Sequence, residues 1–194
     1  MPHDDHQFDP ERLAQMEDSR RRVFPPEETL AHFLTRPDLV IADIGCGPGF
    51  YAIPAAKMIP AGHVMAVDRQ ADMLAWTQQR AKEAGIANLS TVQSLADDLP
   101  FSDATFDAVL MANVLHDLPD YGGILKEVLR ILKPGGIYFL VEWDKVETAF
   151  GPPLDIRFAP EELEALLQSY NFAAVHTIAA PSPWYQMFAK KPEE

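Results

Sequence analysis

The stretch "DIGCGPGF", residues 43–50, places three glycines at alternate positions directly after an apolar run. Glycine in the interior of a helix or strand weakens it by about 0.5–1 kcal/mol relative to alanine. Gly45, Gly47 and Gly49 therefore indicate a sharp bend in the backbone, or the close approach of a group that a side chain would block. The run before them, residues 39–44, is short and rich in branched residues, which is typical of a strand covered on both faces.

Apolar runs and helical patterns alternate from residue 39 to residue 143. Strand–helix alternation of this length is typical of right-handed βαβ crossovers, so we predict an α/β fold with a doubly wound, mostly parallel sheet. The sequence Lys-Pro-Gly-Gly at 133–136 is expected to end the third helix. The strands expected in this region are 39–44, 63–68, 88–93, 106–113 and 137–143, and the helices are 50–59, 71–85 and 124–133.

The last third of the chain has a different pattern. A helix at 160–170 precedes two strands, 173–179 and 183–190. The link at 180–183 is too short for a crossover connection, so these two strands are predicted to pair antiparallel as a hairpin.

The N-terminal segment is separate in kind from the sheet. Asp9 is placed to cap a helix with Pro10 at its first position, and a second helix starts at 25–28. Because both helices precede the sheet, we expect them to lie against it or across the edge where a ligand binds. The chain is predicted to be a single domain, with an N-terminal helical cap segment at 1–36 and the sheet at 37–194.

Composition argues against several partners. Of the 194 residues 29 are acidic and 16 basic, a net charge of −13, whereas nucleic-acid binding relies on Lys and Arg that neutralise phosphates. The basic run at 19–24, "SRRRVF", is expected to be a solvated helix face. Cys46 is the only cysteine, which excludes an intrachain disulfide and a multi-thiolate zinc site.

No stretch approaches the roughly 18 apolar residues of a membrane span, and the N-terminus has no apolar signal region. We therefore expect no membrane span and a cytoplasmic location. The N-terminal residues His3, Asp4, Asp5 and His6 have metal-ligating side chains, but a frayed terminus is the expected structure there, so no metal site is predicted.

Two acidic residues accompany the glycines at the place where open parallel sheets bind ligands, beyond the carboxyl ends of the strands. Asp43 stands just before the glycines, and Asp68 ends the next strand, where a carboxylate can accept both hydroxyls of a ribose. Together they predict a site for an adenosine-containing ligand. The alternative is a tight strand-to-helix turn that binds nothing.

The spacing of the glycines favours one class of nucleotide. The dinucleotide fingerprint is G-x-G-x-x-G, whereas the third glycine here is Gly49, one position early, and Pro48 removes an amide donor from the loop. A carboxylate beside the loop, Asp43, suits a cationic ligand better than a diphosphate. These features favour S-adenosylmethionine over NAD.

Four segments in order resemble the class I S-adenosylmethionine-dependent methyltransferases, of the small-molecule branch that includes the ubiquinone/menaquinone-biosynthesis methyltransferases. The resemblance implies a seven-stranded sheet in the order 3-2-1-4-5-7-6 with the last strand antiparallel, and a methyltransferase domain at 37–194. It also implies transfer of a methyl group from S-adenosylmethionine to a small-molecule acceptor, leaving S-adenosylhomocysteine. The four segments are "DIGCGPGF" (43–50), "VMAVD" (64–68), "DLPFSDATFDAVLMANVLHDLPD" (98–120) and "EVLRILKPGGIYFLVEW" (127–143).

The resemblance also implies which residues bind the cofactor. The glycine loop would pass beneath it, Asp43 would hold its methionine end, Asp68 would bind the ribose diol, and the backbone carbonyl of Asn113 would accept the methionine ammonium. Arg69 and Met73 would flank the adenine. The full implied set is Asp43, Gly45, Cys46, Gly47, Gly49, Asp68, Arg69, Met73, Leu95, Ala96, Asp97 and Asn113.

One departure from the family pattern affects the adenine. Relatives often read Gly-Asp-Ala where this chain reads Ser94-Leu95-Ala96. The Leu95 side chain cannot accept a hydrogen bond from the adenine amino group. We therefore expect Asp97 or the backbone to supply that contact, or a weaker site.

The chemistry needs few side chains, because methyl transfer is an in-line displacement that depends mainly on orientation. Cys46 is expected to be a small packed residue rather than a covalent catalyst. The Asn/Asp-Pro-Pro-aromatic motif of base and glutamine methylation is absent after the fourth strand. His116, which stands there, is a candidate general base for a hydroxyl or enol acceptor. The alternative is that His116 fixes the cofactor loop or caps a helix.

Aromatic residues could form the walls of an apolar acceptor pocket, although plain core packing is the alternative. Two rival functions remain: a cofactor-binding protein without turnover, and an NAD-dependent dehydrogenase. The candidate wall residues are Trp143, Phe150 and Phe158, with Phe8 and Phe24 from the N-terminal segment.

Overall fold

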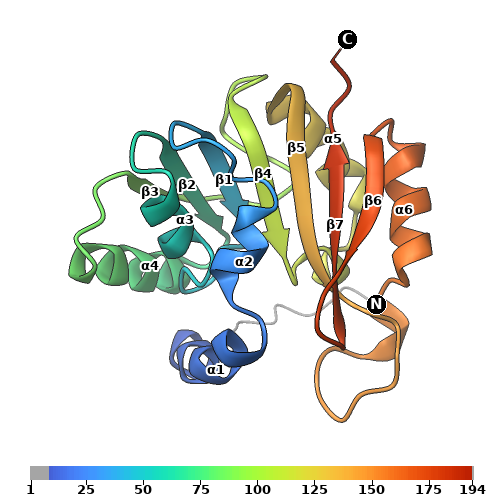
Figure 1. Cartoon of the computed structure of the whole chain (residues 1–194), viewed down its shortest axis with the longest axis horizontal. Helices are drawn as coiled ribbons and strands as arrows, with labels where there is room; N and C mark the ends of the chain where they lie inside the picture. Colours follow the sequence, from blue (N-terminus) through green and yellow to red (C-terminus); the bar gives the residue numbers. More distant parts are fainter. Residues whose placement is uncertain (1–8, 194) are drawn as a thin grey trace.

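The computed structural model describes residues 9–193, which form one seven-stranded sheet with helices on both faces (Figure 1). The strand order is β3-β2-β1-β4-β5-β7-β6; the pairs from β3 to β5 are parallel, and β7 is antiparallel to β5 and β6. The predicted fold class, strand order and antiparallel last strand are confirmed. The elements are α1 (Pro10–Val23), α2 (Pro26–Ala31), β1 (Val40–Ile44), α3 (Ala52–Met58), β2 (His63–Asp68), α4 (Ala71–Glu83), β3 (Leu89–Gln93), β4 (Phe106–Ala112), the 3₁₀ helix η1 (Leu115–Asp117), α5 (Tyr121–Ile131), β5 (Leu132–Trp143), the 3₁₀ helix η2 (Leu154–Ile156), α6 (Pro160–Ser169), β6 (Ala173–Ala179) and β7 (Trp184–Lys190).

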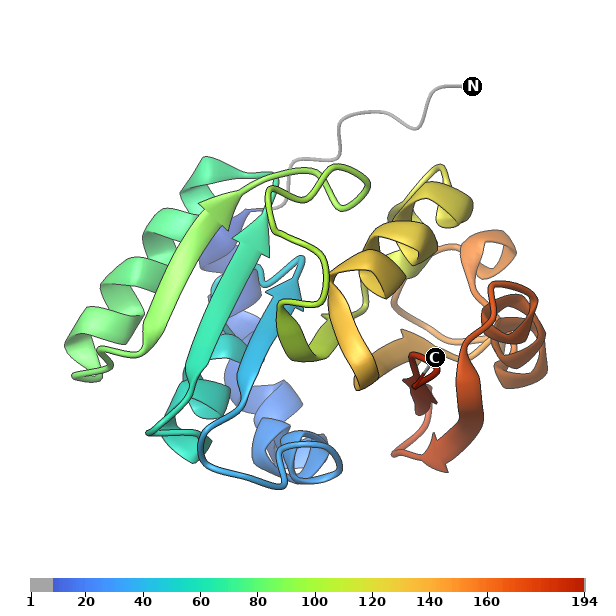
Figure 2. The same cartoon turned by 90° about the horizontal axis from the view of Figure 1, so that it is seen from above.

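Burial on both faces of the sheet explains the apolar sequences of the central strands. Side chains alternate between the two faces along a strand. Ala42 and Ile44 of β1 pack in one core cluster with α5 and α6, whereas Ile41 packs in a second cluster with α2 and α3. Figure 2 shows α5 and α2 on opposite sides of the sheet. Asp43 follows Ile41 by two residues and therefore faces the α2–α3 side.

The start of β5 differs from the sequence prediction. Residues 133–136 were expected to end a helix, but the strand already begins at Leu132, which pairs with Phe106 of β4. The register between β4 and β5 then shifts. Pro134 is tolerated in this stretch because its missing N–H falls where the hydrogen-bonded ladder is interrupted.

Helix α1 lies at the end of the sheet toward which β1 and β2 point (Figure 1). Its predicted cap is confirmed, since Asp9 Oδ1 accepts the backbone N–H of Glu11 at 2.9 Å. Glu17 accepts two hydrogen bonds of 2.6 Å from the guanidinium of Arg80 on α4. Arg80 also donates to the carbonyl of Pro48 at 2.7 Å. These contacts tie α1 to the glycine loop, while the predicted division of the chain at residue 36 stays a prediction.

Candidate functional site

The glycine loop follows β1 directly and bends sharply at the carboxyl end of the strand. The N–H groups of Gly45 and Cys46 both donate to the carbonyl of Val67 in β2, at 2.8 and 2.9 Å. Gly45 has φ +72°, and a Cβ there would collide with Val114 after β4. At Gly47, with φ +52°, no described atom lies within 4 Å of the position that a Cβ would take. The loop is thus closely packed at Gly45 and open above Gly47, where a ligand can approach the backbone.

One side of the loop, here called the β3 side, comprises Asp68 and residues 94–105. Asp68 Oδ2 accepts the N–H of Gly47 and Oδ1 accepts the N–H of Gln70, both at 2.9 Å. Burial raises the pKa of Asp68, and these N–H groups act in the opposite direction. Each carboxylate oxygen keeps a second lone pair, so Asp68 can still accept hydroxyl groups.

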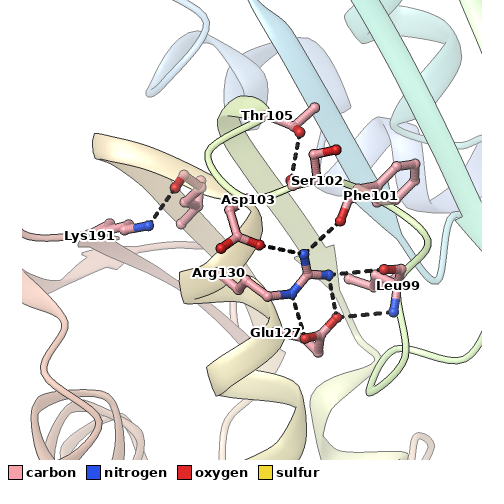
Figure 3. A network of polar contacts seen from close by, with 9 residues as sticks. Leu99, Phe101, Ser102, Asp103, Thr105, Glu127, Arg130 and Lys191 are labelled. Atoms are coloured by element: carbon pink, nitrogen blue, oxygen red, sulfur yellow. Dashed lines mark hydrogen bonds and ion pairs between the residues drawn. The ribbon is translucent and has the colours of Figure 1, made fainter.

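A network around Arg130 of α5 holds the β3 side in place (Figure 3). The guanidinium donates to the carbonyls of Leu99 (3.0 Å) and Phe101 (2.6 Å) and to Asp103 (2.9 Å). It also makes two hydrogen bonds of 2.8 Å to Glu127, which in turn accepts the N–H of Leu99 at 3.1 Å. The loop that carries Leu95, Ala96 and Asp97 is therefore anchored at its base by charge-assisted hydrogen bonds.

The other side of the loop, here called the α1 side, comprises Asp43, Tyr51, Arg20 and Thr29. Asp43 is 2% exposed, and its Oδ2 has no hydrogen-bond partner among the described residues. Burial, with a smaller effect of the charge of Asp68, raises the pKa of Asp43 to about 7. The carboxylate is therefore a buried group that a cationic ligand would stabilise.

Arg20 comes from α1 and lies over two aromatic rings of the glycine loop. Its guanidinium carbon is 4.4 Å from the ring centre of Phe50 and 5.5 Å from that of Tyr51. The predicted solvated face of the arginines at 19–24 holds for the exposed Arg22 but not for Arg20, whose Nε and Nη2 atoms are buried. Within the described part of the chain, these two nitrogens, Thr29 Oγ1 and the Tyr51 hydroxyl make no hydrogen bond of ordinary geometry. Burial raises the pKa of Tyr51, whereas Arg20 and the Thr29 hydroxyl lower it, so the Tyr51 hydroxyl lies close to both.

The remaining predicted cofactor residues lie around the β3 side. Met73 is buried at the start of α4, and Arg69 is exposed directly after Asp68. Leu95 is 58% exposed, Asp97 is exposed, and Ala96 is half-buried against the core. The structure thus brings these residues to the same edge of the sheet, and their contacts with the cofactor stay predictions.

Cys46 behaves as a packed residue. It is 6% exposed and belongs to the core cluster on the α2–α3 face. Burial, with the charges of Asp43 and Asp68, raises the pKa of its thiol well above the ordinary value. Since the thiolate is the reactive form of cysteine, Cys46 is a poor nucleophile here.

The segment after β4 contains Asn113 and His116. Asn113 has φ +56°, donates its N–H to the Val141 carbonyl at 2.7 Å, and has a buried Oδ1 with no partner among residues 9–193. His116 Nδ1 lies 2.6 Å from Glu142 Oε2, and Glu142 Oε1 accepts the N–H of Leu115 at 3.0 Å. Glu142 thereby fixes both η1 and the imidazole ring.

The charge state of His116 follows from this pairing. Burial acts to lower the pKa of His116, but the hydrogen bond and charge of Glu142, with the charge of Asp117, raise it above the ordinary value. With Nδ1 directed at Glu142, Nε2 is the atom left to exchange a proton, and it lies 3.5 Å from Asp117 Oδ1.

Four aromatic side chains gather at the carboxyl ends of β5 and the start of β7. The ring centre of Trp143 is 4.8 Å from that of Trp184 and 5.6 Å from that of Phe150, and Phe24 stacks on Trp184 at 6.1 Å. Sequence reasoning missed Trp184, because only the long-range antiparallel pairing of β7 with β5 places it beside Trp143. Phe158 lies apart from this aromatic cluster, against Tyr121.

Several N-terminal candidates lie outside the described residues, namely Phe8 and the residues His3, Asp4, Asp5 and His6. Among residues 9–193, no helix has the length and apolar character that crossing a bilayer requires.

The strand order, the glycine loop and its two flanking carboxylates together define the class I methyltransferase fold. Residues 41–136 match a family model described as "Methyltransferase domain". A solved structure of an S-adenosylmethionine-dependent methyltransferase from Aquifex aeolicus superimposes with a TM-score of 0.86 and 28% identity, covering 95% of this chain and all of that one. The matched region, residues 41–136, is a class I S-adenosylmethionine-dependent methyltransferase domain, a family whose cofactor is S-adenosylmethionine.

Two further comparisons mark how far the likeness extends. The demethylmenaquinone methyltransferase of Geobacillus sp. (strain WCH70) is 32% identical over 127 residues, which are 65% of this chain and 54% of that protein. The chain thus spans about half the length of the curated relatives it matches. The [4+2]-cyclase SpnF superimposes over 87% of this chain and 80% of that one, with a TM-score of 0.75 and 19% identity, which is a likeness of fold alone.

Proposed function

We propose that this protein transfers a methyl group from S-adenosylmethionine to a small-molecule acceptor by in-line displacement. The observation that carries the proposal is the open backbone above Gly47, between the carboxylates of Asp43 and Asp68. The cofactor supplies an electrophilic methyl group on a sulfonium, which leaves as the neutral thioether. The chain supplies the orientation, which in such reactions contributes several kcal/mol.

We propose an aromatic acceptor with an apolar substituent. The aromatic cluster of Trp143, Phe150, Trp184 and Phe24 supports this, since offset or edge-on ring contacts favour a planar ligand. The relatives named as demethylmenaquinone methyltransferases also favour a quinol-like ring. The net charge of −13 favours a neutral acceptor over a polyanion.

We assign His116 as the base that takes the proton released by the acceptor. Its Nδ1 is held by Glu142 at 2.6 Å, so that Nε2 in the neutral ring is the basic atom. Because the pKa of His116 is raised, the neutral form gains population only as the pH rises through that raised value. The rate of methyl transfer is therefore expected to increase as the pH rises toward the pKa of His116 and to become constant above it.

The proposal is tested by incubating the protein with methyl-labelled S-adenosylmethionine and reduced demethylmenaquinone, with a metabolite extract in parallel. We expect labelled product and S-adenosylhomocysteine in equal amounts. Tight cofactor binding without label in any product would instead favour the cofactor-binding protein without turnover. Binding of NAD but not of S-adenosylmethionine would favour the dehydrogenase.

The role of His116 is tested with His116→Asn. A general base contributes typically about 100- to 10,000-fold, so kcat should fall by at least about 100-fold and its pH dependence should flatten. The affinity of this variant for S-adenosylhomocysteine should stay within about threefold of that of the unaltered protein, a difference of less than about 1 kcal/mol. Loss of that affinity with an unchanged pH profile would show instead that His116 only fixes the segment after β4.

A further inference from the structure

The α1 side of the glycine loop combines buried polar atoms that the described chain leaves unpaired. Thr29, Tyr51 and Asp43 are 0%, 3% and 2% exposed, and each keeps an oxygen without a hydrogen-bond partner among the described residues. Arg20 adds two buried nitrogens in the same condition. In a folded protein most buried polar groups are hydrogen-bonded, so a concentration of unpaired ones at a ligand site indicates partners that the ligand brings.

The charges on this side are of both signs but do not pair with each other. Among the described residues, Arg20 makes no ion pair with a carboxylate and lies over the rings of Phe50 and Tyr51, although its charge acts on Asp43. Asp43 Oδ2 stays without a donor. A ligand with a carboxylate beside an ammonium would satisfy the guanidinium and the carboxylate together.

We infer that Arg20, supported by the hydroxyls of Tyr51 and Thr29, binds the carboxylate of the cofactor's methionine end while Asp43 attracts its ammonium. This rests on the proposed use of S-adenosylmethionine and extends it to a residue outside the matched methyltransferase region 41–136. The guanidinium offers a planar fork to a carboxylate. Helix α1 is thus part of the cofactor site and not only a cover over it.

The position of α1 does not depend on Arg20 alone. Glu17 and Arg80 join α1 to α4 with two hydrogen bonds of 2.6 Å, and Arg80 joins them to Pro48. A substitution of Arg20 therefore removes the guanidinium while the helix keeps its tether to the loop. A methionine at this position retains an unbranched apolar stem that can pack on Phe50.

The experiment compares two ligands, S-adenosylmethionine and decarboxylated S-adenosylmethionine, which keeps the ammonium and sulfonium but lacks the carboxylate. Calorimetry of the unaltered protein should show about 10- to 100-fold tighter binding of S-adenosylmethionine, as for the loss of a charge-assisted hydrogen bond. Arg20→Met should bind both ligands with nearly the same affinity. Arg20→Lys keeps the charge without the fork and should show an intermediate preference.

Arg21→Met is the matched control. Arg21 belongs to the same helix and also lies over Phe50, at 5.0 Å, but it pairs with Glu27 at 3.3 Å. This variant should keep the preference of the unaltered protein. Thermal unfolding of each ligand-free variant establishes that the fold is retained, and Arg20→Lys carries the comparison if Arg20→Met does not fold.

The outcomes separate this inference from the proposed function. No binding of S-adenosylmethionine by the unaltered protein would overturn both, whereas binding without a preference over the decarboxylated ligand would overturn only the role of Arg20. The role of Arg20 would also be overturned if Arg20→Met still preferred S-adenosylmethionine, or if its affinity for each of the two ligands fell by the same factor. If Arg20→Met binds S-adenosylmethionine as tightly as the unaltered protein but has a raised KM for reduced demethylmenaquinone, the inference is overturned and Arg20 contacts the acceptor instead.

Discussion

The two sides of the glycine loop differ in how completely their polar groups are satisfied. On the β3 side, both oxygens of Asp68 accept backbone N–H groups, and Arg130 makes hydrogen bonds to the loop that follows β3 (Figure 3). On the α1 side, Asp43, Tyr51 and Arg20 keep buried polar atoms without partners among the described residues. The polar groups on the β3 side are thus hydrogen-bonded in the free protein, whereas several on the α1 side are not.

An unpaired buried polar group costs about 1–3 kcal/mol, so the unpaired groups of the α1 side lower stability unless a ligand forms hydrogen bonds with them. The β3 side then supplies geometry that exists before binding, while the α1 side supplies interactions that form on binding. Stability of the free protein should respond mainly to changes on the β3 side. Ligand affinity and its dependence on pH should respond mainly to changes on the α1 side.

The largest effect is expected from Gly47→Val, which alters the loop between the two sides. A side chain at this position enters the open space where the ligand approaches the backbone, and φ +52° is unfavourable for valine. We expect affinity for S-adenosylhomocysteine to fall on the order of 1,000-fold, about 4 kcal/mol, measured by calorimetry.

Gly85→Val is its matched control. Gly85 has φ +67° at the end of α4, and again no described atom lies within 4 Å of a Cβ there. The two substitutions share the backbone strain and differ in their distance from the site. Equal losses of affinity in the two variants would show that strain, and not occupied ligand space, explains the effect.

A smaller effect, on stability, is expected from Arg130→Met on the β3 side. It removes the Arg130 donor from the Phe101 carbonyl, and it leaves the Leu99 carbonyl with only the N–H of Phe101 and Glu127 with only the N–H of Leu99. Urea unfolding should therefore show a loss of about 2 kcal/mol. The preference for S-adenosylmethionine over its decarboxylated form should not change. The comparison of the two sides fails if this preference disappears while stability is kept.

Arg36→Met provides the control for Arg130. Arg36 is 57% exposed and pairs with Asp38 and Asp107 at 3.6 Å. Since exposed ion pairs contribute about 0–1 kcal/mol, its removal should change the free energy of unfolding by less than about 1 kcal/mol.

The β3 side was the more predictable from sequence, and the reason is locality. Asp68 ends an apolar strand, and the glycines follow another, so a period-two pattern and a turn signal place both groups at one edge. The strand order beyond the hairpin followed from the resemblance. The predicted start of β5 at residue 137 was wrong, since the strand begins at Leu132. The sequence Pro-Gly-Gly is typical of a helix end and does not indicate an irregular strand.

The α1 side could not be predicted in the same way. Arg20 stands in a run of three arginines, and nothing in that run distinguishes Arg20, which lies over both Phe50 and Tyr51, from its neighbours. Trp184 depends on the register of β7 against β5, where it pairs with Trp143. Both positions are set by contacts between segments far apart in the chain, which local patterns do not encode.

The smallest expected effect, at most about 1.4 kcal/mol for each pH unit, is the pH dependence of cofactor binding, which tests the α1 side through Asp43. Burial raises the pKa of Asp43 to about 7, with Asp68 adding to the rise and Arg20 opposing it. The free protein therefore holds a proton on Asp43 below pH 7, and this proton must leave before the carboxylate can attract the ammonium. Because the folded-state pKa lies above the ordinary value of 3.8, this group lowers stability as the pH rises from about 4 to 7.

Affinity for S-adenosylmethionine should change in the opposite direction. It should increase by up to about tenfold per pH unit below pH 7 and become constant above it, since one proton is released for each ligand bound. Asp43→Asn cannot release that proton, so its affinity should be low and nearly independent of pH between 5 and 8, leaving only the weaker contribution of Asp68. Calorimetry in buffers of different ionisation enthalpy counts the released proton directly. A pH dependence that survives in Asp43→Asn would assign the titration to Asp68. The β3 side, and not the α1 side, would then be the one whose interactions form on ligand binding.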